Sequence, residues 1–317
     1  MQSKKRRSRT LTPEEEVLLK VHISDDEAFS KFERDCNIRN LRPATIKYYK
    51  NELSSFMKSV EKIGINKPMT QLTKKDIEDV ILHLKANIKT VSINTRIRAL
   101  KSFFNFLHKN KLISKNPMTN IKQLRSRQRL IETLDDTEIE KVAKTIKNQN
   151  SFIGVRDLAI FILMIDTGIR LSELTGIEVD DIRGNKIIIK KTKNLLERTA
   201  YLSKRTQELL QRYLMIRGKL DTNILFVNID NGPLKPRGIQ NRFEKYKEQC
   251  KLTKQFSPHI LRHTFAKNSI INGMDAFTLA KLLGHSDITV TRRYVNLWGD
   301  DLEEKAKKYS SINRLKI

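Results

Sequence analysis

The segment that most constrains the fold of this chain is an almost uninterrupted apolar run from Val155 to Thr167, which stops at Gly168. A helix that is apolar all round is stable in water only where other elements cover it on every side. We therefore predict a central buried helix, ended by the glycine, around which a domain is built. Its longest wholly apolar part, Leu158 to Ile165, is far shorter than the roughly 20 residues that cross a bilayer, so no membrane span is expected.

Ahead of that run, the chain from Asp25 to about Lys115 repeats apolar residues at steps of three and four, which predicts three or four short amphipathic helices. Pro43 stands where a first helical turn accepts proline, and Thr73 with Asp76 three residues on resembles a capping box. We therefore predict a small all-α domain here.

Asn116 and Pro117 end this helical part, because the residue before a proline is disfavoured in a helix. The polar, basic segment that follows is interpreted as a linker that itself touches phosphate. Its basic side chains are Lys122, Arg125, Arg127 and Arg129. The expected parts are a basic flexible arm at 1–24, the helical domain at 25–118, the linker at 119–133 and a second domain at 134–317.

The second domain is expected to be mainly α with a small β-sheet, an α+β arrangement. Asp136 can cap a helix that continues through Val142. Two stretches that begin at Lys186 and Arg198 are separated by a polar turn, which predicts a β-hairpin. Residues 300–309 are expected to form an amphipathic tail helix.

Basic residues outnumber acidic ones by 62 to 36, so the formal net charge is +26. Residues 1–133 carry 29 basic and 14 acidic side chains and residues 134–317 carry 33 and 22, so both parts are basic. Because lysine and arginine near phosphate release condensed counterions, nucleic acid is the expected partner.

The N-terminal charges are followed by no apolar stretch, so no secretion signal is expected. Cys36 and Cys250 are too few for a disulfide framework or a cysteine-based metal site, which fits a cytoplasmic protein.

Three polar clusters in the second half can carry chemistry. In the first, the end of the buried helix presents Arg170, with Glu173 one turn away; alone, such a pair is most often a structural ion pair. In the third, His285 precedes Tyr294 by nine residues, and a lone tyrosine there would ordinarily be packing.

The second cluster lies at the start of an expected helix capped by Ser257. Steps of three and four place His259, Arg262 and His263 on one face of that helix. Two histidines four residues apart could also bind zinc, but the glutamate and third ligand of a zinc protease motif are missing. We therefore expect no metal.

Together and in this order, the motifs Thr-Gly-Ile-Arg-Leu-Ser-Glu-Leu, His-x-x-Arg-His and Leu-Gly-His…Tyr resemble the tyrosine recombinase family, the phage-integrase, Xer and Cre-like enzymes. The resemblance implies an N-terminal SAM-like core-binding domain and a C-terminal catalytic domain. It implies site-specific DNA recombination through a covalent 3′-phosphotyrosine and a Holliday junction, without a cofactor. Integration or excision of a mobile element, transposition and resolution of DNA dimers stay open.

The resemblance also implies the roles of the site residues. Arg170 and Arg262 would bind the non-bridging phosphate oxygens, since guanidinium groups stay protonated and bind such oxygens in pairs. Tyr294 would attack, and His259 would take its proton because a tyrosine is mostly neutral at pH 7. His285 would donate a hydrogen bond to the phosphate. Two further residues, Glu173 and His263, would support the site.

The family protonates the leaving 5′ oxygen with a lysine on a hairpin turn. Matching Glu197 and Arg198 to the family pattern Gly-Lys-Gly-x-x-x-Glu-Arg places that lysine at Lys193, although both glycines are missing. Lys191 is the alternative.

The implied partners are double-stranded DNA with inverted half-sites, a homotetramer on DNA whose C-terminal tails are exchanged between protomers, and accessory DNA-bending factors. Two alternatives are a catalytically silent DNA-binding or architectural protein and a type IB topoisomerase-like enzyme. The first predicts a damaged site, yet each expected residue type is present. The core-binding-like first domain and the Leu-Gly-His…Tyr motif favour a recombinase over the second.

Overall fold

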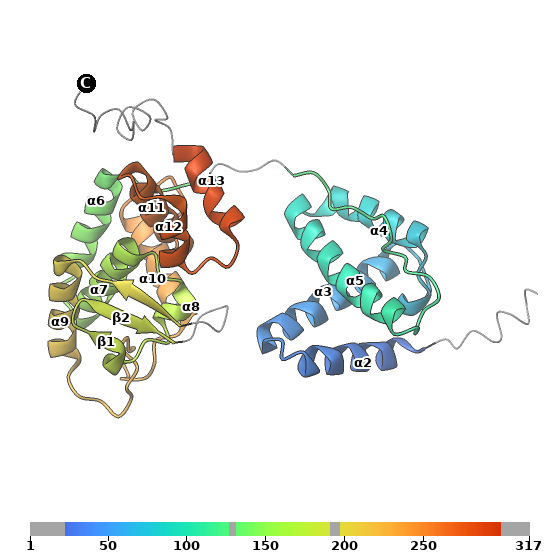
Figure 1. Ribbon diagram of the computed structural model, residues 1–317, viewed down its shortest axis with the longest axis horizontal. Coiled ribbons are helices and arrows are strands. Elements are labelled where there is room, and N and C mark those ends of the chain that lie inside the picture. Colours follow the sequence, from blue (N-terminus) through green and yellow to red (C-terminus); the bar gives the residue numbers. More distant parts are fainter. Residues whose placement is uncertain (1–22, 127–130, 191–196, 299–317) are drawn as a thin grey trace, which may run out of the picture. The chain divides into compact units, whose positions relative to one another are not determined.

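The computed structural model describes residues 23–126, 131–190 and 197–298. The chain divides into two compact units, Met1–Arg129 and Leu130–Ile317, each with its own apolar core (Figure 1). No described helix is long and apolar enough to cross a membrane. The expected basic arm, apart from Ile23 and Ser24, and the expected tail helix lie outside the described residues.

The first unit is helical, as predicted. Its helices are α2 (Asp25–Ile38), α3 (Pro43–Lys62), α4 (Lys74–Asn87) and α5 (Thr90–Lys109), with a 3₁₀ turn at Met69–Gln71. Pro43 opens α3, and Thr73 forms the predicted capping box with Asp76 at the start of α4. Both predictions are confirmed. Each depends on residues only a few positions apart, so the local sequence was sufficient to make it.

Part of the segment expected as linker packs onto the first unit. Ile121 is buried in its core, and the backbone of Leu124 exchanges two hydrogen bonds with the side chain of Asn94. Lys122 and Arg125 are exposed beside these anchors, whereas residues 127–130, which include Arg127 and Arg129, lie outside the described residues.

The second unit is mainly α-helical with one small sheet, which confirms the predicted fold class (Figure 1). Its elements are α6 (Asp136–Lys147), α7 (Phe152–Thr167), α8 (Leu171–Leu174), a 3₁₀ turn at Val179–Asp181, β1 (Ile182–Arg183), β2 (Lys186–Ile189), β3 (Arg198–Tyr201), α9 (Lys204–Arg217), α10 (Pro236–Gln249), α11 (Pro258–Ile271), α12 (Ala276–Leu283) and α13 (Ile288–Trp298). Asp135, not the predicted Asp136, caps α6, because Asp135 and Glu138 form a reciprocal capping box.

Helix α7 is the predicted buried helix, and it packs against α6, α9 and α11. It begins at Phe152, three residues earlier than predicted, because Ser151 caps it. Gly168 ends it with a φ of 58°, and a Cβ there would lie 2.5 Å from the ring of Phe265 on α11. Only glycine provides both this left-handed backbone and this close approach.

Among the described residues, three strands form one antiparallel sheet in the order β1, β2, β3. The predicted hairpin is β2 with β3, and β1 is an addition that the sequence analysis missed. Ile187 and Ile189 of β2 face the core. Residues 191–196, which include Lys191 and Lys193, lie outside the described residues.

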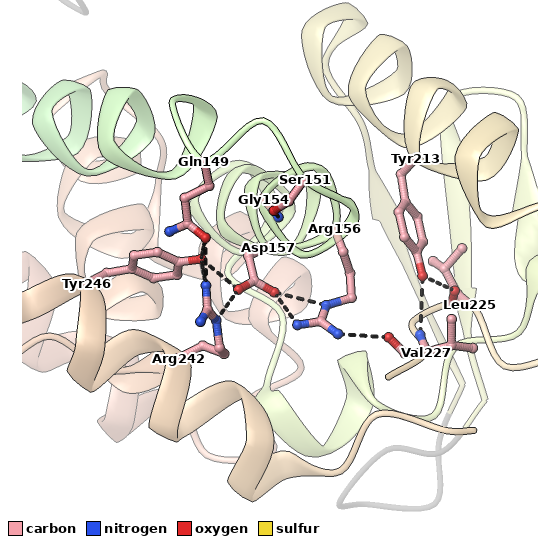
Figure 2. Close-up of polar contacts among 10 residues, drawn as sticks. All are labelled: Gln149, Ser151, Gly154, Arg156, Asp157, Tyr213, Leu225, Val227, Arg242 and Tyr246. Atoms are coloured by element: carbon pink, nitrogen blue, oxygen red, sulfur yellow. Dashed lines mark hydrogen bonds and ion pairs between the residues drawn. The ribbon is translucent and has the colours of Figure 1, made fainter. Parts of the chain in front are cut away.

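A buried polar network ties α7 to α10 (Figure 2). The carboxylate of Asp157 accepts hydrogen bonds from Arg156 (2.7 and 2.9 Å), from Arg242 (2.7 Å) and from the hydroxyl of Tyr246 (2.7 Å). Arg156 also donates to the carbonyl of Val227, 71 residues further along the chain. We call these groups the Asp157 network. Their donors and acceptors are paired with one another, which is typical of a polar network that stabilises the fold.

Candidate active site

Two arginines of the predicted site meet at the C-terminal end of α12. Arg170 follows the end of α7 and donates to Glu173 Oε1 (2.8 Å) and to the carbonyl of Gly284 (3.0 Å). Arg262, on α11, donates to the carbonyls of Gly168 (2.7 Å) and Leu283 (2.7 Å). Residues more than 90 positions apart in the chain are thus brought into one cluster.

A third arginine belongs to this cluster, and the sequence analysis used it only as a marker of the hairpin motif. Arg198, the first residue of β3, donates to Glu173 Oε2 at 2.7 Å and to the carbonyl of Leu282 at 2.6 Å. Its place at the start of a predicted strand carried no signal, because its partners are remote in sequence. We call Arg170, Arg198, Arg262 and Glu173 the arginine cluster.

The charges of the arginine cluster are only partly balanced. Burial alone would raise the pKa of Glu173, but its hydrogen bonds to Arg198 and Arg170 and their charges lower it, so this carboxylate is ionised. Burial and the charges of Arg170 and Arg198 lower the pKa of Arg262 to about 9. Three guanidinium groups around one carboxylate leave a formal surplus of two positive charges.

His285 adjoins the arginine cluster, and its hydrogen bonds define its tautomer. An arginine can only donate, so His285 Nε2 accepts from Arg262 at 2.9 Å, and Nδ1–H donates to the hydroxyl of Thr291 at 2.7 Å. Burial and the charges of Arg262 and Arg170 lower the pKa of His285 to about 4. The imidazole is therefore neutral at pH 7, and in this arrangement its Nε2 cannot donate to a phosphate.

Tyr294 lies on α13 and is 4% exposed. Its hydroxyl is 2.7 Å from His263 Nδ1, and its ring stacks on Trp298 at a centroid distance of 5.8 Å. Burial, together with the charges of His259 and Arg262, lowers the pKa of His263 to about 4, while burial raises the pKa of Tyr294. The contact is therefore a hydrogen bond between a neutral imidazole and a protonated hydroxyl.

His259, the expected proton acceptor, is exposed on the first turn of α11, and it is His263 that contacts the hydroxyl of Tyr294. His259, Arg262 and His263 share one face of α11 but differ in burial, since His259 is exposed, His263 half-buried and Arg262 buried. Lys193 lies outside the described residues. Lys122 and Arg125 belong to the first unit.

No group of three or more histidine, cysteine, aspartate or glutamate side chains that could hold a metal ion occurs in the described ranges. At the predicted site, the concentrated positive charge is supplied by arginine side chains.

Two family models cover most of the chain. Residues 132–298 match the phage integrase family, and residues 29–114 match the phage integrase N-terminal SAM-like domain. Among individual proteins, the chain is 30% identical to tyrosine recombinase XerC of Listeria welshimeri over 285 residues, which cover 86% of this chain and 93% of the relative. It is 28% identical to XerC of Treponema denticola, over 85% of this chain and 93% of the relative.

Solved structures share the fold. The Tn1549 transposon integrase, in complex with a circular intermediate DNA, matches with a TM-score of 0.71 and 20% identity over 92% of this chain and 100% of that chain. A lambda integrase dimer bound to a COC′ core site matches with a TM-score of 0.71 and 17% identity, over 92% of this chain and 82% of that chain.

The matched domains and relatives define a site-specific recombinase, an enzyme that acts on DNA. Its two-unit helical architecture agrees with that class. The chain belongs to the phage integrase family of tyrosine recombinases.

Proposed function

We propose that Tyr294 attacks a DNA phosphodiester, forming a covalent 3′-phosphotyrosine and releasing a 5′-hydroxyl. The observation that carries this proposal is the gathering of Arg170, Arg262, His285 and Tyr294 from separate elements of one unit. Because the tyrosyl ester conserves the energy of the phosphodiester, the hydroxyl of another strand can displace it, and exchange proceeds through a Holliday junction.

The arginine cluster would stabilise the transition state. The non-bridging oxygens of a phosphate under attack gain negative charge, and Arg170 and Arg262 would bind them within a site that already carries surplus positive charge. A phosphate bound there also offers a negative partner to His285, which favours its protonated form. We infer that His285 becomes a donor to the phosphate only once DNA is bound.

The contact between Tyr294 and His263 belongs to the DNA-free state in this proposal. A histidine with a pKa of about 4 is a poor acceptor for the proton of a tyrosine whose pKa is raised above 10. We therefore propose that Tyr294 leaves His263 when DNA binds and gives its proton to His259. Lys193, with Lys191 as the alternative, would protonate the leaving 5′ oxygen. These two roles rest on the family resemblance.

The proposed DNA substrate is a pair of inverted half-sites, gripped by the helical domain, the catalytic domain and the linker side chains Lys122, Arg125, Arg127 and Arg129. Four protomers would assemble on two such sites, with exchanged C-terminal tails and, in some contexts, DNA-bending factors, inside the cytoplasm. Integration and excision of a mobile element and resolution of DNA dimers are the two proposed roles. A measured mass of fewer than four protomers on two synapsed sites would refute the tetramer.

Trapping the covalent intermediate tests the reaction and finds the site. Cells that express the wild-type chain or Tyr294→Phe are lysed in denaturant, and DNA that stays attached to the protein is sequenced. We expect one recurrent inverted-repeat sequence with the wild type and none with the variant, because phenylalanine cannot attack phosphorus. Adducts in the variant would place the nucleophile elsewhere.

If the wild type forms no adduct either, a silent DNA-binding protein is favoured. Relaxation of supercoiled DNA without strand exchange between sites would favour the topoisomerase-like alternative.

A further inference from the structure

The last carbonyls of α12 are each bound by a different arginine of the arginine cluster. The pairs are Arg198 Nη1 with Leu282 (2.6 Å), Arg262 Nη2 with Leu283 (2.7 Å) and Arg170 Nη2 with Gly284 (3.0 Å). Carbonyls at the end of a helix lack intrahelical partners and carry partial negative charge, so cationic donors suit them. The end of α12 therefore fixes the spacing of three guanidinium groups.

Arg198 differs from the other two arginines in how it is occupied. Its side chain is 8% exposed, and its Nη1 and Nη2 bond to Leu282 and Glu173. Its Nε is buried and has no partner among the described residues. The side chain of Arg170, by contrast, is 21% exposed, and Arg262, which is as buried as Arg198, bonds to backbone carbonyls and His285 but to no carboxylate. Arg198 is therefore the buried arginine of the cluster that holds Glu173.

The two groups that Arg198 holds both lead to the predicted phosphate site. The fully buried carboxylate of Glu173 bonds to Arg198 through Oε2 and to the guanidinium of Arg170 through Oε1. Leu282 lies three residues before His285. Loss of Arg198 would leave Oε2 with only the backbone N–H of Arg170 (3.0 Å) and would free one carbonyl, and both the Arg170 side chain and His285 could then shift.

The packing at Gly284 leaves little room for such a shift in the intact protein. Its φ is 63°, and a Cβ there would lie 2.9 Å from Arg198 Cδ and 3.6 Å from Arg170 Nη1. The two arginine side chains therefore lie directly against the backbone of this glycine.

We propose that Arg198 is a positioning residue for DNA strand cleavage: through Glu173 and the end of α12, it sets where Arg170 and His285 meet the phosphate. The inference rests on the proposed function of the same site. The role that the proposal gives to Arg198, at the start of β3, is to position the groups that bind the phosphate. This role is separate from protonation of the leaving group.

The first test compares cleavage of a nicked half-site by Arg198→Gln, Arg198→Lys and a matched control, Arg183→Gln. Arg183 is an exposed arginine of β1 in the same sheet, so its loss removes the same charge. Since a misplacement of about 1 Å can lower a rate 10²-fold, we expect both Arg198 variants to cleave about 10²-fold more slowly, with DNA affinity within about 2-fold of wild type. Full activity of Arg198→Lys would show that charge alone matters and would overturn positioning.

Modified DNA identifies the step that is affected. Sulfur in place of the bridging 5′ oxygen makes a leaving group that needs no proton, so it should restore a Lys193→Ala variant but not Arg198→Gln. A neutral methylphosphonate at the cleaved position reduces the need for the arginines, so the deficit of Arg198→Gln should shrink there at least about 10-fold. Restoration by bridging sulfur, or an equal deficit on all substrates, would refute the proposal.

A measurement without catalysis separates this proposal from the proposed function. Burial, Arg262, Arg170, Arg198 and His263 together lower the pKa of His285 to about 4. NMR titration of the ¹⁵N-labelled imidazole should show a shifted pKa in folded Arg198→Lys, which keeps the charge but loses the paired hydrogen bonds, and an unchanged one in Arg183→Gln. An unchanged His285 titration in Arg198→Lys would contradict the link even if wild-type cleavage is normal, and a shifted one would support it even if no adduct forms.

Discussion

The second unit contains two polar clusters, each built from arginine side chains around one carboxylate: the Asp157 network and the arginine cluster. The first is structural, and the second belongs to the candidate active site. In the Asp157 network, Arg156 and Arg242 share one carboxylate, and Tyr246 donates to it as well (Figure 2). In the arginine cluster, Arg170 and Arg198 share the carboxylate of Glu173, and all three arginines donate to backbone carbonyls, which carry only partial charges.

The pKa values of Arg242 in the Asp157 network and of Arg262 in the arginine cluster shift in opposite directions. Burial alone would lower the pKa of Arg242, but its hydrogen bonds to Asp157 and Tyr246 raise it above the ordinary value. Burial and neighbouring arginines lower the pKa of Arg262 to about 9. The carboxylate of Asp157 already gives Arg242 an anionic hydrogen-bond partner. Arg262 has no anionic hydrogen-bond partner among the described residues, and a bound phosphate would provide one.

Tyr246 and Tyr294 repeat this contrast. Tyr246 donates to a carboxylate, and burial together with the charge of Asp157 raises its pKa to about 12. Tyr294 shares a hydrogen bond with a neutral histidine, a weaker partner than a carboxylate. Tyr246, in the structural network, is therefore held by a charged group, whereas the candidate nucleophile Tyr294 is held by a neutral one.

The largest expected effect is on stability and comes from the Asp157 network. Asp157→Asn leaves the buried Arg156 and the partly exposed Arg242 without their carboxylate, and breaking a buried pair in this way costs roughly 3–5 kcal/mol. The free energy of unfolding, measured by urea denaturation, should fall by that amount, with Asp230→Asn on the exposed surface as the control. An unchanged urea midpoint would show that the network is not structural.

The next effect is expected to be larger on cleavage than on stability. Arg262→Gln removes a donor to the phosphate, so cleavage of the trapped site should slow by about 10²–10³-fold. Because the substitution also relieves repulsion within the arginine cluster, its free energy of unfolding should drop less than that of Asp157→Asn. A larger loss of stability with normal cleavage would erase the distinction between the clusters.

The smallest effect is on acid stability. The pKa values of His263 and His285 are depressed in the folded protein to about 4, below the value of about 6.5 for an unfolded chain, so the unfolded state binds protons first. The stability that they contribute is fully present above about pH 6.5 and is lost as the pH falls toward 4. His263→Asn with His285→Asn should flatten this part of the stability profile, and His108→Asn on the exposed end of α5 should leave it unchanged. A slope that persists in the double variant would assign it to other groups.

Local features of the fold could be predicted from the sequence, because their causes are a few residues apart. The glycine after α7, the proline that opens α3 and the capping box of Thr73 are of this kind. The cap of α6 was predicted one residue late, although Glu138 stands three positions after Asp135 and marks the correct cap. The signal was present there and was misjudged between two adjacent aspartates.

Contacts that depend on tertiary packing could not be found this way. The family motifs identified the residues of the candidate site, but not that His263, 31 positions from Tyr294, contacts its hydroxyl. Nor did any pattern indicate that Arg198 reaches Leu282, 84 positions away. The first pairing follows from how α11 packs on α13 and the second from how β3 packs on α12, and a motif does not encode that packing.

Gly168 contributes both to the packing of the domain and to the candidate active site, two properties that protein engineering usually tries to change separately. Its missing side chain lets α11 approach the end of α7, and its carbonyl accepts a hydrogen bond from Arg262. Any replacement would strain the backbone and push away Phe265 and Leu283, whose carbonyl is also bound by Arg262. Directed evolution of this recombinase toward greater stability or new DNA targets should therefore find no tolerated substitution at this position, because one residue limits both folding and cleavage.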